Sequence, residues 1–145
     1  MIKEFKAIII GNCGVGKTTF LNRLCNINNN FTNSKPTIGI NVKKFYKSDI
    51  SINFWDTSGQ EKYKAITKNY LRNSIVVFLV FDVNDYQTFM DIENYWLEEA
   101  KKYSEKNVMY ALFESNFTGW HKVLGRAGIA SGQMILPRSV FSKLK

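Results

Sequence analysis

A glycine-rich octapeptide near the N-terminus constrains the fold of this chain more than any other feature. Residues 11–18 read Gly-Asn-Cys-Gly-Val-Gly-Lys-Thr and match the pattern Gly-x-x-x-x-Gly-Lys-Thr. An apolar run at 2–10 precedes the pattern, and Phe20, Leu21 and Leu24 follow it at helical spacing. Strand, glycine loop and helix in this order are the context in which such a loop holds phosphate. The alternative is a chance match in an ordinary turn, which the flanking pattern disfavours.

The chemistry of phosphate binding accounts for each fixed position of this loop. Its three glycines allow successive backbone N–H groups to point inward at phosphate oxygens. A helix that begins near Gly16 adds the positive end of its dipole at the same place. Lys17 reaches the β- and γ-phosphates of a nucleotide, and the Thr18 hydroxyl is a ligand for Mg²⁺. The candidate phosphate-binding residues are therefore Cys13, Gly14, Val15, Gly16, Lys17, Thr18 and Thr19.

Strand-like and helix-like segments alternate along the rest of the chain. Short apolar or alternating runs predict strands at 2–10, 40–46, 50–55, 75–81 and 108–113, with 75–81 as a central parallel strand. Helical spacing predicts helices after residue 16, at 65–72 and at 86–104. Residues 26–37 are polar and rich in asparagine, which predicts a mobile loop. The alternation favours βαβ crossovers, so we expect an α/β fold of the P-loop NTPase type, with a mostly parallel sheet and flanking helices.

A second polar segment, Asp-Thr-Ser-Gly-Gln at 56–60, follows the predicted strand at 50–55. A phosphate loop needs a carboxylate for the metal, and Asp56 is placed for this role at the end of a neighbouring strand. Mg²⁺ keeps several waters and takes few protein ligands, so one carboxylate acting through water suffices. Gly59 is placed to bring a backbone N–H to a terminal phosphate, and Gln60 to orient an attacking water. An ordinary turn after a strand is the alternative interpretation.

Composition excludes several other classes of protein. The 145 residues are 45% apolar and 22% charged, which is the range of one soluble globular domain. The longest apolar run, at 75–81, is far shorter than the ~18–20 residues of a membrane span. Two cysteines make no disulfide framework. The net charge of +8 fits nucleic acid, an acidic membrane or solubility alone, but it is unevenly placed: 15 basic against 11 acidic groups at 1–106, and 5 against 1 at 107–145.

Several motifs together resemble the small GTPases of the Ras superfamily, and in particular the Rab family. Residues 55–61 read Trp-Asp-Thr-Ser-Gly-Gln-Glu and differ at one position from the Trp-Asp-Thr-Ala-Gly-Gln-Glu of these proteins. Residues 36–41, Pro-Thr-Ile-Gly-Ile-Asn, resemble the first switch of the Rab branch. Residues 70–74, Tyr-Leu-Arg-Asn-Ser, resemble its Tyr-Tyr-Arg-Gly-Ala. The resemblance extends over about residues 4–113.

The resemblance implies a guanine-nucleotide switch and a role for each matching residue. Outside the glycine loop, the implied nucleotide contacts are Phe31 at the base, Thr37 and Gly59. The implied Mg²⁺ ligands are Thr18, Thr37 and Asp56. Gln60 would position the attacking water, so it is the implied catalytic residue. Catalysis in such sites is positioning and charge stabilisation, so the resemblance implies slow turnover, accelerated on the order of 10³–10⁵-fold by an arginine from an activating partner.

The resemblance also implies partners and a place in the cell. A γ-phosphate would order residues 31–39 and 57–65, and hydrolysis would release them. The implied partners are guanine nucleotide, GTPase-activating and exchange proteins, and effectors that bind 31–46 and 57–72. The implied process is vesicle and membrane trafficking, in the cytoplasm and at the cytosolic face of endomembranes where a lipid-anchored form exists.

The C-terminal part departs from the family pattern. Family members read guanine with Asn-Lys-x-Asp and Ser-Ala-Lys, and neither motif occurs in this sequence. We therefore expect a C-terminally incomplete Ras-like domain, with a Rab-like core at 1–113 and a poorly ordered basic tail at 114–145. The tail is explained either by an altered reading of a longer gene or by a segment that binds acidic lipid or a partner. The last residues hold no cysteine for prenylation, so we expect no lipid anchor on this chain.

Three other functions remain open on the sequence. A degenerate module would bind nucleotide or partners without cycling between two states. An adenine-specific P-loop enzyme conflicts with the motif at 55–61. Nucleic-acid binding rests on the basic charge alone, and we do not expect it.

Overall fold

The computed structural model describes residues 2–25, 36–47, 49–60, 64–106 and 108–115. They form one five-stranded sheet in the order β2-β3-β1-β4-β5. The strands are β1 (Lys3–Ile10), β2 (Ile40–Lys47), β3 (Ile50–Thr57), β4 (Val76–Asp82) and β5 (Met109–Ser115). All neighbouring pairs are parallel except β2 with β3, which are antiparallel. The sheet is therefore mixed but mostly parallel, as the sequence predicts.

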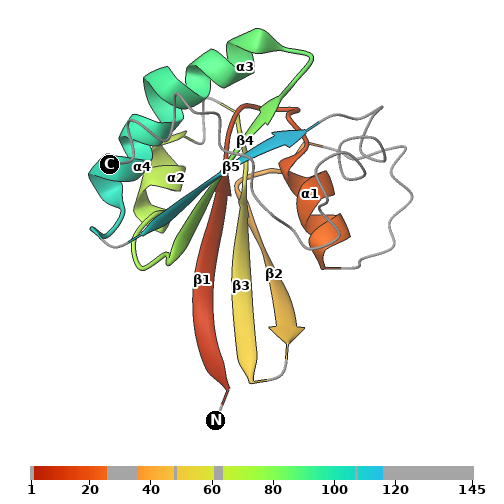
Figure 1. Ribbon diagram of the computed structural model, residues 1–145, viewed down its shortest axis with the longest axis vertical. Coiled ribbons are helices and arrows are strands. Elements are labelled where there is room, and N and C mark those ends of the chain that lie inside the picture. Colours follow the sequence, from red (N-terminus) through yellow and green to blue (C-terminus); the bar gives the residue numbers. More distant parts are fainter. Residues whose placement is uncertain (1, 26–35, 48, 61–63, 107, 116–145) are drawn as a thin grey trace.

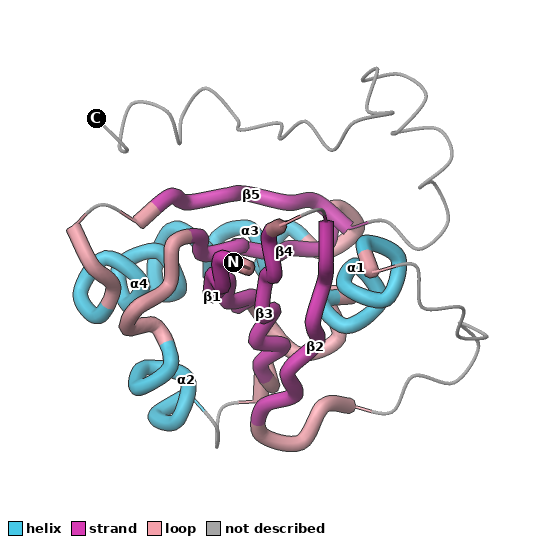
Figure 2. Tube along the Cα trace, turned by 90° about the horizontal axis from the view of Figure 1, so that it is seen from below, coloured by secondary structure: helices cyan, strands magenta, loops and turns pink. Residues whose placement is uncertain are grey.

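Helices cover both faces of this sheet. Helix α1 (Lys17–Leu24) lies on one side, and α2 (Lys64–Tyr70) and α4 (Leu97–Tyr103) lie on the other (Figures 1 and 2). The segment from α3 (Tyr86–Asp91) to α4 is one continuous helical stretch, interrupted by a π-helical turn, η3 (Ile92–Trp96). The part of the chain that the structure describes contains no helix long and apolar enough to cross a membrane.

Alternate residues of the buried strands belong to two separate hydrophobic cores, one on each face of the sheet. On β1, Ile8 and Ile10 pack with Trp96 and other apolar side chains of the helices on the α2–α4 side. Ala7 and Ile9 point to the opposite face and pack in the core beneath α1. Because side chains on a strand alternate between faces, a strand covered on both sides reads as an unbroken apolar run. The run of residues 7–10 is therefore apolar without interruption, and all four are 0–2% exposed.

Most of the predicted elements are present, with shifted ends. The strand expected at 50–55 continues through Asp56 to Thr57, because both residues still pair with β2. The segment expected at 75–81 is an interior strand, but β1 is the middle strand of the five. Strand β5 runs to Ser115, two residues past the boundary at 113 where we expected the core to end. Most of the predicted loop at 26–37 and nearly all of the predicted tail at 114–145 lie outside the described residues.

The carboxyl ends of the parallel strands gather the polar loops at one edge of the sheet. The glycine loop follows β1, and the segment at 57–60 continues from β3. These two strands are hydrogen-bonded neighbours, with Ile9 paired to Asp56. Binding sites in open α/β sheets lie at the carboxyl ends of the strands. The topology therefore brings together the two motifs that the sequence analysis singled out.

Candidate phosphate-binding site

The glycine loop begins with a close contact between two backbones. Gly11 has φ +145°, and a Cβ at this position would stand 2.2 Å from the carbonyl oxygen of Val80 in β4. Only glycine can occupy such a position without moving the strand. The chain can therefore turn sharply from β1 into the loop while staying packed against the sheet.

Helix α1 directs its uncapped N-terminus at the space inside the loop. The helix begins at Lys17 directly after Gly16, and no side chain caps it. Its first turn contains no acidic residue. The first N–H groups of a helix need acceptors, and the helix dipole makes that end partially positive. An anion in the loop meets both requirements.

Lys17 is a buried cation without an ion pair among the described residues. It is 6% exposed, and its Nζ donates hydrogen bonds to the carbonyl oxygens of Gly11 (2.9 Å) and Asn12 (2.6 Å). Burial lowers the Lys17 pKa to about 8, although the charges of Asp56 and Cys13 oppose the shift. An ammonium has three donor hydrogens, and two are used here. A phosphate oxygen next to Nζ would supply the missing acceptor and the missing negative charge.

Thr18, Thr37 and Asp56 bring three side-chain oxygens together beside the loop. The Thr18 hydroxyl donates to Asp56 Oδ2 at 2.7 Å, and its Oγ1 lies 2.9 Å from that of Thr37. Because Thr18 has one hydrogen, Thr37 is the donor in the second contact. Asp56 is fully buried, and its Oδ1 has no hydrogen-bond partner in the described part of the chain. Hydroxyl and carboxylate oxygens are the ligands that Mg²⁺ prefers, and an unpartnered buried carboxylate oxygen fits a cation in this position.

The ionisation of Asp56 depends on the same neighbours. Burial raises its pKa, while the Thr18 hydrogen bond and the charges of Lys17 and Lys43 lower it. Burial is the largest of these effects, so the site holds a carboxylate whose charge is poorly solvated. A bound cation would reverse that effect.

Residues 57–60, which follow Asp56 and are called the aspartate segment below, pack directly on the glycine loop. A Cβ at Gly59 would stand 2.3 Å from the backbone of both Asn12 and Cys13. Thr57 Oγ1 donates to the carbonyl oxygen of Ile9 at 2.6 Å, and the Ser58 N–H donates to that of Gly39 at 2.8 Å. The segment therefore bridges the glycine loop and the chain around Thr37.

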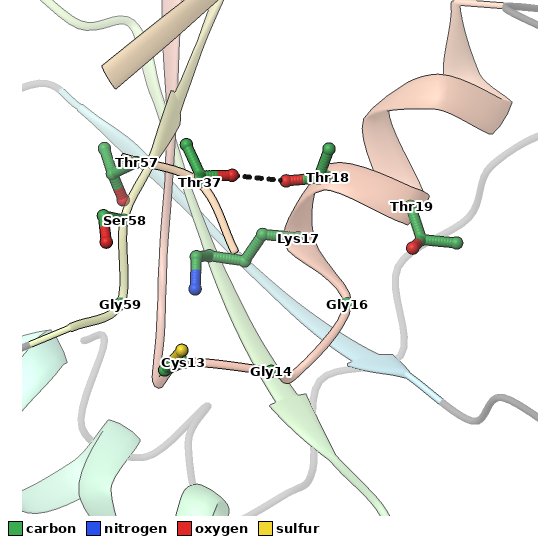
Figure 3. Close-up of a pocket in the computed structure, with 10 residues that line it drawn as sticks. All are labelled: Cys13, Gly14, Gly16, Lys17, Thr18, Thr19, Thr37, Thr57, Ser58 and Gly59. Carbon is green, nitrogen blue, oxygen red and sulfur yellow. Dashed lines mark hydrogen bonds between the residues drawn. The ribbon is translucent and has the colours of Figure 1, made fainter. Parts of the chain in front are cut away.

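One pocket collects most of the predicted nucleotide contacts (Figure 3). The Lys17 side chain reaches into the space between the loop and the segment at 57–59, whereas the Thr19 side chain points away from Thr37. The pocket is lined by Cys13, Gly14, Gly16, Lys17, Thr18, Thr19, Thr37, Thr57, Ser58 and Gly59. Among these described lining residues, Lys17 is the only charged one.

Four predicted site residues fall outside this lining, and one of them is Asp56, which lies behind Thr18 and reaches the site through its hydrogen bond to that hydroxyl. The Val15 side chain is 2% exposed in the core beneath α1, so only its backbone faces the loop. Gln60 follows Gly59 and donates its backbone N–H to Ser58 Oγ at 3.3 Å. Phe31, the residue expected to stack on a base, lies outside the described residues.

Two residues that support the glycine loop, Ser115 and Asn12, are not found by a search for sequence motifs. The buried Ser115 at the end of β5 donates its hydroxyl hydrogen to the carbonyl oxygen of Val15, and its Oγ lies 3.1 Å from that of Phe81. The Asn12 side chain accepts a hydrogen bond from Trp96 Nε1 at 2.7 Å. The contacts of Ser115 with Val15 and of Asn12 with Trp96 link positions more than 80 residues apart, and no spacing rule in the sequence points to them.

Comparison with known proteins identifies the family of this arrangement. The family described as "Ras family" matches residues 6–117. The Ras-related protein RABA1c of Arabidopsis thaliana is 38% identical over 113 residues, which cover 74% of this chain and 51% of the relative. The Ras-related protein Rab-3 of Caenorhabditis elegans is 37% identical over 113 residues, covering 74% and 50%. The Ras-related protein RIC2 of rice (Oryza sativa subsp. japonica) is 37% identical over 113 residues, covering 74% and 51%.

The chain spans about half the length of the curated relatives that it matches. The matched region contains β1 from Lys6 onward, the whole of the other four strands, and every described residue of the pocket. Sequence motifs, sheet topology and family match agree, and the chain belongs to the Ras family, within which it is Rab-like.

Proposed function

We propose that this chain is a GTP-binding and GTP-hydrolysing molecular switch of the Rab type that acts in vesicle and membrane trafficking. One observation carries the proposal: the buried Lys17 and the cluster of Thr18, Thr37 and Asp56 converge at the N-terminus of α1. An ammonium and free helix N–H groups suit phosphate, and an oxygen cluster beside them suits the cation that accompanies it.

In this proposal the glycine loop binds the nucleotide through its phosphates. Lys17 Nζ would donate its third hydrogen to a β- or γ-phosphate oxygen, and backbone N–H groups of 13–18 would hold the other phosphate oxygens. The buried position of Lys17 strengthens this contact, because solvent screens a buried charge less than an exposed one. Because Lys17 would contact the β- and γ-phosphates, the affinity for a nucleotide should depend on how many phosphates it has.

Thr18, Thr37 and Asp56 would hold Mg²⁺, with Asp56 acting directly or through water. The ion would neutralise charge on the β- and γ-phosphates. Thr37 has to release its hydrogen bond to Thr18, and Thr18 its hydrogen bond to Asp56, before both hydroxyl oxygens can face a cation. The hydrogen bonds among Thr18, Thr37 and Asp56 thus keep these side chains close to the positions proposed for them around the ion.

The same contacts suggest how the two switch segments would respond to the nucleotide. Thr37 belongs to the first segment, and Ser58 and Gly59 to the second, which is bonded to the first through Gly39. A γ-phosphate would be held by Thr37 on one side and by the Gly59 N–H on the other. Its loss on hydrolysis would release both segments, and effectors would recognise the difference through 31–46 and 57–72.

Gln60 would orient the water that attacks the γ-phosphate. Its neighbour Gly59 packs on the glycine loop, which places Gln60 next to the pocket. The proposal is tested by single-turnover hydrolysis of GTP and ATP by the purified chain with Mg²⁺, comparing wild type with Gln60→Leu. We expect GTP hydrolysis that Gln60→Leu slows at least about tenfold while GTP still binds. Equal rates of GTP hydrolysis by wild type and Gln60→Leu, or turnover of ATP alone, would contradict the proposed function.

A specific observation supports a second candidate, a Rab-like module that does not cycle. Strand β5 ends in Glu114 and Ser115, and the Ser115 hydroxyl is used on Val15 and Phe81. No Asn-Lys-x-Asp follows in the sequence. Hydrogen bonds to a base provide discrimination of roughly 10⁴ or more, so a chain without them selects guanine poorly. Partner binding that is the same with GTP, with GDP and without nucleotide favours this candidate.

A further inference from the structure

Asn12 connects the glycine loop to the long helical stretch at 86–103. Its Oδ1 accepts a 2.7 Å hydrogen bond from Trp96 Nε1, and its Nδ2 donates to Asp91 Oδ2 at 2.5 Å. Gln87 Nε2 donates to the other oxygen of Asp91 at 2.9 Å. The amide thus uses its acceptor on one partner and a donor on the other. An asparagine satisfies both partners at once, whereas a carboxylate at the same place would face Asp91 with like charge.

The backbone of Asn12 lies beside the pocket, in contact with two residues that line it. Its carbonyl oxygen accepts the shorter of the two Lys17 hydrogen bonds, at 2.6 Å. Its carbonyl carbon is one of the atoms that a Cβ at Gly59 would strike. A shift of Asn12 therefore moves a hydrogen-bond partner of Lys17 and the surface on which Gly59 rests.

The helical side of this contact is built from an irregular turn. Asp91 is the last residue of α3, and Trp96 closes the π-helical turn η3. A π-turn widens the helix, and such turns occur frequently at functional sites. Trp96 is 2% exposed, so its indole N–H would be buried without a partner if Asn12 moved away. Loss of such a bond leaves the donor desolvated and without an acceptor, which is unfavourable.

Helix α2, which follows the aspartate segment, contacts the same tryptophan. Lys64 Nζ lies 4.3 Å from the ring centre of Tyr95 and 5.5 Å from that of Trp96. Farther along α2, Lys68 forms a 2.8 Å ion pair with Glu99 of α4. Lys64 in the first turn of α2 and Asn12 in the glycine loop thus both lie near the side chain of Trp96.

We propose that Asn12 is a positioning residue of the phosphate site, and that its contacts with Trp96 and Asp91 couple the glycine loop to helix α2. The proposal rests on the proposed function, because it assigns Asn12 a part in holding the nucleotide phosphates. The Asn12 side chain is bonded to Asp91 and Trp96, so it would act on the loop and on α2 through the helical stretch that holds these two residues.

Three substitutions separate the contacts. Asn12→Ala removes both hydrogen bonds, Trp96→Phe removes one donor while keeping a ring under Lys64, and Asn12→Asp keeps the acceptor but places a carboxylate against Asp91. The matched control is Thr88→Val, which deletes buried hydrogen bonds to Asp82 and Asp85 on the same helical stretch, away from the loop. All variants are compared by chemical denaturation, so that a loss of stability alone can be subtracted.

The first measurement is the dissociation rate of a fluorescent GDP analogue with Mg²⁺. We expect the three variants to release it about three- to thirtyfold faster than wild type, and Thr88→Val to match wild type within about twofold. The double variant Asn12→Ala with Trp96→Phe should release it no faster than Asn12→Ala alone, because one interaction is removed in both. Release at the wild-type rate in the three variants, or an equal change in Thr88→Val, overturns the proposal.

The second measurement needs no nucleotide. Amide hydrogen exchange in α2 of the unliganded chain should accelerate in Asn12→Ala and Trp96→Phe, and should not change in Thr88→Val. Unchanged exchange in α2 overturns the coupling. If the wild-type chain binds no GDP, the proposed function fails and the exchange experiment still decides whether Asn12 and α2 are coupled.

Discussion

Lys17 is the residue whose environment is hardest to explain without a ligand. A lysine side chain that is 6% exposed and has no ion pair among the described residues loses most of its hydration. Its pKa of about 8 expresses that cost. Between pH 8 and 10.5 the unfolded chain still holds this proton while the folded chain has lost it, so the contribution of Lys17 to the free energy of unfolding rises with pH, by about 3 kcal/mol in all.

Proton uptake on binding follows from the same pKa. A phosphate stabilises the charged ammonium, so a bound nucleotide should raise the Lys17 pKa above 8. We expect GDP binding at pH 8.5 to take up a proton, which isothermal titration calorimetry detects as a dependence of the apparent enthalpy on the ionisation enthalpy of the buffer. Lys17→Met, a variant of similar length, should bind weakly and show no uptake. Buffer-independent enthalpy in wild type contradicts a phosphate contact at this ammonium.

Asp56 gives the complementary prediction for the cation. Its buried Oδ1 has no partner among the described residues, and burial raises its pKa. Asp56→Asn removes a poorly solvated charge, so the thermal stability of the unliganded chain should stay the same or increase. The effect of Mg²⁺ on GDP affinity should fall at least about tenfold, because the only carboxylate of the Thr18, Thr37 and Asp56 cluster is lost. Equal Mg²⁺ dependence in both proteins would place the ion elsewhere.

At the scale of elements, the contact between the glycine loop and the aspartate segment determines the shape of the pocket. Gly59→Ala puts a methyl group 2.3 Å from the backbone of Asn12 and Cys13, so one segment must move. We expect the free energy of unfolding to fall by about 1–3 kcal/mol and GDP to dissociate faster. Gly39→Ala is the control: its φ of +69° is strained for alanine, but no atom lies within 4 Å of the new Cβ, and the residue does not line the pocket. A pocket unaffected by Gly59→Ala would mean that the segments do not pack this way in solution.

Local patterns predict the elements well and their ends less well. The strand expected at 50–55 continues to Thr57 because pairing with β2, a tertiary contact, outweighs the polar character of Asp56. The helix expected at 86–104 is present as a helical stretch over Tyr86–Tyr103, but its π-turn is not foreseen, because apolar spacing of three and four cannot distinguish an α-turn from a slightly wider one.

Some residues of the site can be predicted from local sequence patterns and others cannot. The glycine loop and Asp56 are predictable because phosphate and metal binding fix residue types at short spacings. Asn12 and Ser115 are not, because each acts through a partner that is distant in sequence and uses a side chain that is common in ordinary turns. The base-stacking role of Phe31 stays a prediction.

At the scale of the whole molecule, the fold places both switch segments at one edge of the sheet. Residues 36–39 and 57–60 are joined by the bond from the Ser58 N–H to Gly39, and Thr37 lies beside the loop. We expect amide exchange in 36–41 and 57–60 to be slower with a non-hydrolysable GTP analogue than with GDP, while the exchange of β1 and β4 stays constant. Identical exchange with the two nucleotides would favour the module that does not cycle.

The basic charge belongs to the same scale. Residues 1–106 carry 15 basic and 11 acidic groups, and 107–145 carry 5 and 1. The Ras-family match ends at residue 117, so the more unbalanced charge lies mostly beyond the matched region. The net charge of +8 therefore gives no reason to expect a nucleic-acid partner for the Ras-like part.

The most direct test of the account is equilibrium binding of GDP and GTP to the purified chain with Mg²⁺, with ATP as competitor and Lys17→Met as the control. The account predicts saturable binding of one guanine nucleotide per chain. This binding should be lost in Lys17→Met and should be weaker when Mg²⁺ is not in excess. A bound nucleotide at 100 times its dissociation constant should also stabilise the chain by about 2.7 kcal/mol. No binding of GTP at high concentration, or equal binding by Lys17→Met, would contradict the central claim.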